Sequence, residues 1–142
     1  MKKVFMSCLI ITVLVVLSSI TYAEEKWVIT YTSESDAGVS EYAIDVNNYR
    51  TIKDGYIYYE KVIVYDQDYT EQFIVIRKNV IRRATHTSII TDIETYLRDP
   101  STGKMRNTSA LIDRTPTKVN FEKGYPNILA TIQFLDELEA DK

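Results

Sequence analysis

Residues 56–66 constrain the fold more than any other segment, because an extended chain would place apolar side chains on both of its faces. One face carries Lys61 together with a row of apolar residues: Ile57, Tyr59, Ile63 and Tyr65. The opposite face carries Glu60 and a second row: Tyr58, Val62 and Val64. Strands that are apolar on both faces are typical of sheet interiors, so this segment is predicted to be a central strand covered on both sides.

Strand-like composition continues on either side of this segment. The expected strands are residues 26–32, 40–45, 56–66, 70–78, 80–95 and 104–113, with 80–95 forming one long strand or two short ones. Residues 46–50 are expected to form a single helical turn, and Asp54-Gly55 is typical of a tight turn. The eleven tyrosines also favour a pleated surface. These features predict an antiparallel sheet of about six strands.

The period of the apolar residues changes near the C-terminus. Pro126 suits the first position of a helix, where its missing N–H costs no hydrogen bond. Apolar residues then recur at helical spacing: Ile128, Ile132, Leu135 and Leu138. They indicate an amphipathic helix of about 14 residues with one face to bury. We therefore expect an α+β fold in which residues 24–142 form a single domain, with the C-terminal amphipathic helix packed on one face of the sheet.

The N-terminus has the pattern of an export signal. Lys2 and Lys3 precede an apolar run that ends at Leu17, and the small residue Ala23 follows. This pattern predicts a secretory signal peptide over residues 1–23, cleaved so that the mature chain begins at Glu24. Retention as a membrane anchor and lipidation at Cys8 are alternatives. The protein is expected in the periplasm or at the cell surface, touching the membrane only through an uncleaved leader.

Charge and cysteine content exclude several classes of site. The formal net charge of −3 argues against nucleic-acid binding, which needs a concentrated positive field. The only cysteine is Cys8, so residues 24–142 have no disulfide and no thiolate to bind a metal or act as a nucleophile. No catalytic signature or metal-site pattern stands out, and we expect a non-enzymatic protein without a cofactor.

A basic cluster is the first candidate binding site. Four positive charges fall within seven residues: Arg77, Lys78, Arg82 and Arg83. They could engage an acidic partner, such as a sulfated glycan, an anionic lipid head group or a carboxylate-rich protein. The alternative is that the first two solvate a strand end and the last two point to opposite faces.

Tyrosines form the second candidate. Tyr56, Tyr58, Tyr59 and Tyr65 could make an aromatic binding face or join two copies in a homodimer, because aromatic residues are enriched at interfaces. They could equally be ordinary sheet-packing residues. Trp27 is expected to anchor the first strand in the core.

Other residues carry weaker signals. His86 is the only histidine, and it is expected to be a surface or edge-strand residue rather than a general base. Residues 66–70 begin like a calcium loop, but Glu71 and Arg77 occupy the positions where that loop needs glycine and glutamate. An acidic turn is therefore expected. Asn107-Thr108-Ser109 fits a glycosylation acceptor, but the leader looks bacterial, so no sugar is expected there.

The order of these features resembles a known family. Trp27 is followed by Tyr42 and Ile44-Asp45, then by Lys53-Asp54-Gly55 before the long aromatic strand. A tyrosine strand turns through Gly103, and Gly124-Tyr125-Pro126 opens the helix. This arrangement is similar to the bacterial surface-adhesin E-like family of small exported proteins.

The resemblance implies an antiparallel sheet with a C-terminal helix lying against it, and binding of host matrix or serum proteins. Family members often tie the helix to the sheet with a disulfide. Here the helix is expected to dock through apolar contacts alone. Two other classes remain open: a small periplasmic ligand carrier or enzyme with a cup-shaped sheet, and an envelope structural protein.

Overall fold

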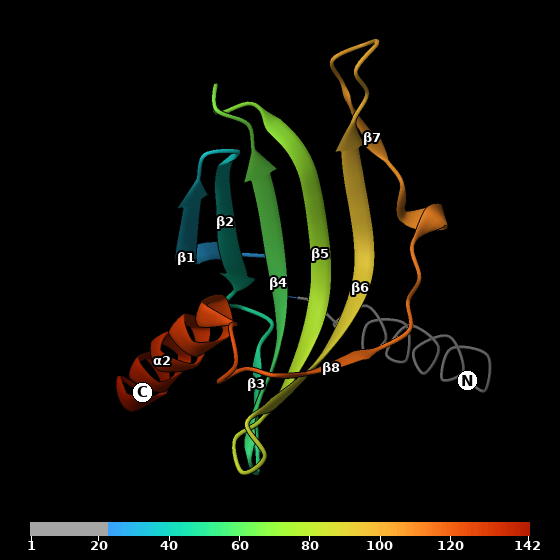
Figure 1. Ribbon diagram of the computed structural model, residues 1–142. Helices are drawn as coiled ribbons and strands as arrows, with labels where there is room; N and C mark the ends of the chain where they lie inside the picture. The colour runs from blue at the N-terminus through green and yellow to red at the C-terminus, as the bar shows by residue number, and fades with distance from the viewer. Residues whose placement is uncertain (1–22) are drawn as a thin grey trace, which may run out of the picture.

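The computed structural model describes residues 23–142, so the expected leader and Cys8 lie outside the described residues. The strands are β1 Trp27–Ser35, β2 Gly38–Asp45, β3 Arg50–Ile52, β4 Gly55–Tyr65, β5 Glu71–Arg82, β6 Thr87–Arg98, β7 Met105–Asn107 and β8 Thr117–Asn120. A 3₁₀ turn, η1, spans Ser109–Leu111, and the helix α2 spans Pro126–Ala140. The strands form one sheet in the order β1-β2-β4-β5-β6-β7, with β3 also paired to β4 and β8 to β6. Every pairing is antiparallel (Figure 1).

The expected antiparallel sheet with a C-terminal helix is confirmed, but the sheet has eight strands rather than about six. The two additional strands, β3 and β8, have only three and four residues, too few to show an alternating pattern. They exist because a long neighbour offers free backbone groups to pair with.

Several expected boundaries were wrong because turns lie elsewhere. The chain reverses after Arg82, so the expected strands 70–78 and 80–95 become the two 12-residue strands β5 and β6. Segment 104–113 is strand only in β7. The expected helical turn 46–50 is a turn over residues 46–48 only, because Arg50 already begins β3. The carboxylate of Asp45 caps the turn by accepting a hydrogen bond from the Asn47 N–H at 3.1 Å.

β4 is central, as expected, since it pairs with β2, β3 and β5. Because both of its edges are occupied, β4 has no free edge for pairing with a second copy, and the homodimer expected through its tyrosines stays a prediction. Its burial alternates: Tyr56, Tyr58, Glu60 and Val62 are buried. The other face is only partly buried, so the expected cover on both sides is also corrected.

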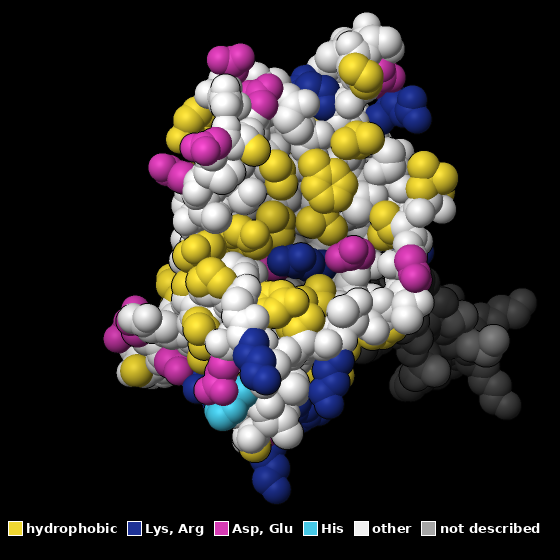
Figure 2. All heavy atoms as spheres, viewed as in Figure 1, with side chains coloured by type: hydrophobic (Ala, Val, Ile, Leu, Met, Phe, Trp, Pro, Cys, Tyr) yellow, Lys and Arg dark blue, Asp and Glu magenta, His cyan; other side chains and the backbone are white. Residues whose placement is uncertain are grey.

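The core lies between α2 and the buried face of β4. Ile128 and Leu135 are fully buried and Ile132 is nearly so, while Leu138 is half-buried. They pack with residues from the sheet and from the segment before α2: Ile44, Tyr56, Tyr58, Ile81 and Phe121. The helix lies in front of the lower part of the sheet (Figure 1). Apolar side chains remain visible above it on the same face (Figure 2).

Hydrogen bonds also hold α2 against the sheet. At the start of the helix, the Asn127 side-chain amide donates to the carboxylate of buried Glu60 at 3.2 Å. Near its middle the hydroxyls of Thr131 and Thr30 are 2.9 Å apart. One turn later, the Tyr56 hydroxyl donates to Asp136 at 2.6 Å. The expectation of docking through apolar contacts alone was therefore wrong.

The turn between β1 and β2 requires glycine. Gly38 has φ +140°, and a Cβ there would overlap the carbonyl oxygen of Tyr65. Gly103 also has a positive φ, +66°, but a Cβ there would meet nothing within 4 Å. We expect Gly38→Ala to lower the free energy of unfolding by about 2 kcal/mol, and Gly103→Ala by about 1 kcal/mol from the backbone conformation alone. Urea denaturation measures both changes, and equal losses would contradict the steric argument.

Candidate binding site on the open sheet face

A hollow of about 710 Å³ lies on the sheet face opposite α2. The register explains its position: Tyr59 alternates with buried Tyr58, and Ile76 pairs with Glu94, so these side chains point away from the helix. The hollow is lined by Ala23, Glu25, Trp27, Asp45, Asn47, Asn48, Tyr49, Arg50, Tyr59, Ile76, Ile93, Glu94 and Tyr96. It therefore draws on both outer parts of the sheet and on the β2–β3 turn.

Trp27 and Glu25 line the hollow on the side of β1. The indole N–H of Trp27 donates to the Glu25 carboxylate at 3.1 Å. The Lys61 ammonium lies 4.2 Å from the centre of the Trp27 ring, at cation–π distance. These contacts hold the ring in place and leave the Glu25 carboxylate with further acceptor capacity.

Tyr96 and Glu94 line the hollow on the side of β6. The Tyr96 hydroxyl donates to the Glu94 carboxylate at 2.7 Å. That hydrogen bond, helped by burial, raises the pKa of Tyr96, so the phenol is neutral at ordinary pH. The pairing of β5 with β6 shifts between Ile76 and Arg77, and this bulge places the neighbours Ile93 and Glu94 together in the hollow.

The β2–β3 turn closes one end. Asp45 is 2 % exposed. Its carboxylate accepts hydrogen bonds from the backbone of Lys26 at 3.0 Å and from the Asn48 side chain at 2.6 Å. The Asn47 side chain donates to the Glu24 carbonyl at 2.6 Å, which fastens the start of the expected mature chain to this turn. The hydrogen-bonding capacity of the Asp45 carboxylate is therefore used within the protein, whereas the side chain of Arg50 is exposed to a ligand.

The hollow combines aromatic rings, aliphatic side chains and carboxylates that keep free acceptor positions. This combination suits a ligand that has apolar surfaces and several hydrogen-bond donors. Among the residues that the structure describes, no group of three or more His, Cys, Asp or Glu side chains is placed to hold a metal ion. Within the same residues, no helix is long and apolar enough to span a membrane.

No protein-family model matches this chain. Comparison with the curated proteins and with the solved structures gives no match either. The assignment of a function therefore depends on the geometry of the chain itself.

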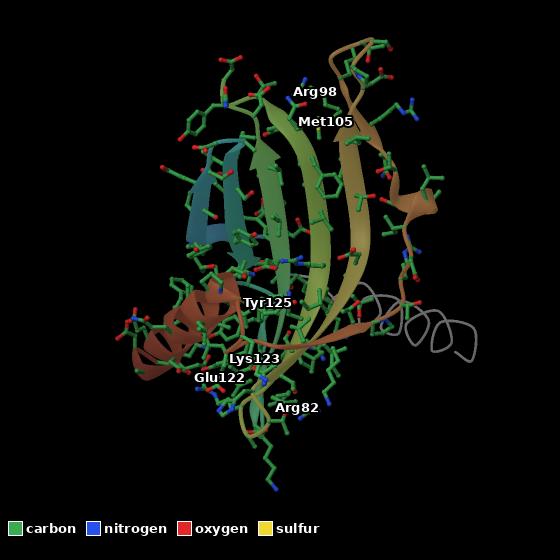
Figure 3. All side chains as sticks on the ribbon, viewed as in Figure 1. Arg82, Arg98, Met105, Glu122, Lys123 and Tyr125 are labelled. Carbon is green, nitrogen blue, oxygen red and sulfur yellow. The ribbon has the colours of Figure 1, made fainter. Side chains whose placement is uncertain are left out.

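The four residues of the basic cluster do not form one patch. Arg77 faces α2, and its Nε donates to buried Glu60 at 2.7 Å. Arg83 forms an ion pair with Asp136 on the helix. Lys78 lies on the open face, opposite Tyr59 in the register. Arg82 is exposed near the β5–β6 turn, at the end of the sheet opposite Arg98 and Met105 (Figure 3).

The tyrosine group is also divided between the two faces. Tyr56 and Tyr58 are 4 % and 0 % exposed and belong to the core, so they offer no surface to a partner while α2 is docked. Tyr59 lines the hollow. Tyr65, further along the open face, donates to Glu41 at 3.0 Å, and burial together with this bond raises its pKa to about 12.

The weaker signals have structural explanations. His86 has φ +51° in the β5–β6 turn, and its Nδ1 lies 3.2 Å from the Glu122 carboxylate. Asp66 caps the β4–β5 turn by accepting hydrogen bonds from the backbone of Asp68 and Thr70, both at 2.9 Å. The Asp66 carboxylate therefore accepts hydrogen bonds from within the turn, as expected of an acidic turn.

Sequence reasoning missed most of the hollow. Trp27 was expected in the core, whereas it lines the open face, and Glu94 was not singled out. The available signal was a second apolar row on β4, which alternates with the buried row and consists of Ile57, Tyr59, Ile63 and Tyr65. Because a single helix covers only one face of a sheet, one of the two rows on β4 had to stay open, although the sequence did not say which one.

Proposed function

We propose that this chain is an exported, non-enzymatic binding protein whose binding surface is the open sheet face. The observation that carries the proposal is the hollow of about 710 Å³ between Trp27 and Tyr96. Aromatic side chains that keep a polar tip and are held in place by hydrogen bonds are favoured at binding surfaces. The helix α2 packs against the other face of the sheet and contributes no residue to the lining of this hollow.

The resemblance to the surface-adhesin E-like family supports the same proposal. It implies export and contact with host matrix or serum proteins. The two arginines that hold Glu60 and Asp136 serve the fold. We therefore assign the contact to the open face rather than to the basic cluster.

A small-ligand carrier is the second candidate. The hollow lies within the range of about 300–1,000 Å³ that is usual for small-molecule sites. The two candidates differ in what occupies the hollow: part of a macromolecule in one, a free small molecule in the other. Fractionation of the native cell separates them, with N-terminal sequencing expected to begin at Glu24. A surface pool supports the adhesin, and a soluble periplasmic pool supports the carrier.

Binding to immobilised fibronectin, type IV collagen and serum albumin tests the adhesin directly. Tyr59→Ala is expected to weaken binding of the exported protein about tenfold, because it removes a central aromatic contact. Tyr31→Ala is the matched control, since Tyr31 packs on Tyr42 on the α2 face at a ring distance of 5.7 Å.

The single change Arg82→Glu tests the basic cluster without breaking the ion pair of Arg83. It should leave binding unchanged. A large loss with Arg82→Glu and none with Tyr59→Ala would move the binding surface to the basic end of the sheet and overturn the proposal.

A further inference from the structure

We infer that the hollow on the open sheet face binds a neutral oligosaccharide, either free or as part of a glycoprotein. The inference rests on the proposed function, because it names the ligand class of the same site. It is carried by two aromatic–carboxylate pairs, Trp27 with Glu25 and Tyr96 with Glu94, placed in one open hollow.

The aromatic residues suit sugar rings. A pyranose ring presents an apolar face of C–H groups and a rim of hydroxyls, and the face packs well on an aromatic ring. Trp27, Tyr59 and Tyr96 come from three different strands, β1, β4 and β6, so the rings are spread across the sheet. A chain of several sugar units can contact more than one of them, which a single compact ligand cannot do as well.

The polar groups suit hydroxyl donors. Glu25 and Glu94 each use one oxygen to accept a hydrogen bond from the neighbouring aromatic residue. A carboxylate has about four acceptor positions, so each retains several for a ligand. Arg50 adds exposed donors at the end formed by the β2–β3 turn.

The charges argue for a neutral ligand. Three carboxylates line the hollow: Glu25, Glu94 and the internally hydrogen-bonded Asp45. Arg50, in the same lining, carries the opposite charge. Lys61 and Lys78 add positive charge to the same face. An anionic glycan would be repelled by the carboxylates of Glu25 and Glu94. A cationic ligand would compete with Lys61, which already lies over the Trp27 ring.

Fluorescence tests the inference at the site itself, because Trp27 is the only tryptophan in the chain. The exported protein is titrated separately with cellotriose, maltotriose and N,N′,N″-triacetylchitotriose. Spermidine and a heparin tetrasaccharide serve as the cationic and anionic probes. We expect a saturable change with at least one neutral trisaccharide at millimolar concentration or below, and none with the two charged probes.

Variants locate the binding. Tyr96→Ala and Glu94→Gln are expected to weaken trisaccharide binding at least fivefold, and the second variant removes the charge while nearly preserving shape. Tyr31→Ala on the opposite face should bind like the wild type. Trisaccharide binding that survives both Tyr59→Ala and Tyr96→Ala would overturn the assignment to the hollow.

The outcomes separate the inference from the proposed function. A saturable, Tyr96-dependent response to spermidine or heparin alone overturns the neutral-sugar inference and leaves the binding function standing. Tyr59-dependent protein binding that persists after enzymatic removal of glycans from fibronectin, with no trisaccharide response, has the same effect. The absence of binding to every small probe and every protein overturns both the neutral-sugar inference and the proposed binding function. Shortened trisaccharide in a mass spectrum keeps the sugar assignment and overturns the non-enzymatic part.

Discussion

Replacing Arg77 by alanine is expected to lower the free energy of unfolding by about 3–5 kcal/mol, because it leaves a buried carboxylate without its cation. Glu60 has a fully buried side chain, whereas that of Arg77 is 21 % exposed. The second partner of Glu60, the Asn127 side-chain amide at 3.2 Å, is neutral and cannot replace the positive charge of Arg77. Urea denaturation followed by circular dichroism measures the loss.

Two controls distinguish the buried pair from an ordinary ion pair. Arg106 and Asp99 are 3.5 Å apart, and the Arg106 side chain is 70 % exposed. Arg106→Ala should therefore cost no more than about 1 kcal/mol. The double variant Glu60→Leu/Arg77→Leu removes both charges and should lose less stability than Arg77→Ala alone. If Arg77→Ala behaves like Arg106→Ala, Glu60 is not held as a buried charge in solution.

Leu135→Ala is expected to lower the free energy of unfolding by about 3 kcal/mol, because it opens a cavity in a closely packed core. Leu135 is fully buried beneath α2, in the cluster that contains Tyr58 and Ile81. No disulfide within the described chain holds the helix, so the loss falls directly on helix docking.

Leu129 provides the matched control on the same helix. Its side chain is 46 % exposed, so Leu129→Ala should change stability by less than about 1 kcal/mol. Thermal or urea unfolding of the two variants gives the comparison. Equal losses at the two positions would mean that α2 does not present the face seen here to the sheet.

The α2 segment was the most predictable part of the fold. Pro126 begins the helix, as expected, and three of the four expected anchors are buried. Such local signals work because helix geometry repeats over only a few residues. The polar anchors were not predictable, because the partners in Asn127–Glu60 and Tyr56–Asp136 are 67 and 80 residues apart in the chain.

The candidate site shows the same division. Alternation indicated two rows on β4, but it could not say which row α2 would cover. The basic cluster looked continuous because its members are close in sequence, yet adjacent strand residues point to opposite faces. Arg77 and Lys78 therefore lie on different sides of the sheet.

By itself, the sequence determined the extended character of the middle of the chain and the helix at its end. These properties follow from interactions between near neighbours and from composition. Only the tertiary structure decided which face stays open, which charges pair inside the protein, and which aromatic residues meet in the hollow. Those features depend on strand register and on where the helix docks, and both are set by contacts between residues far apart in the chain.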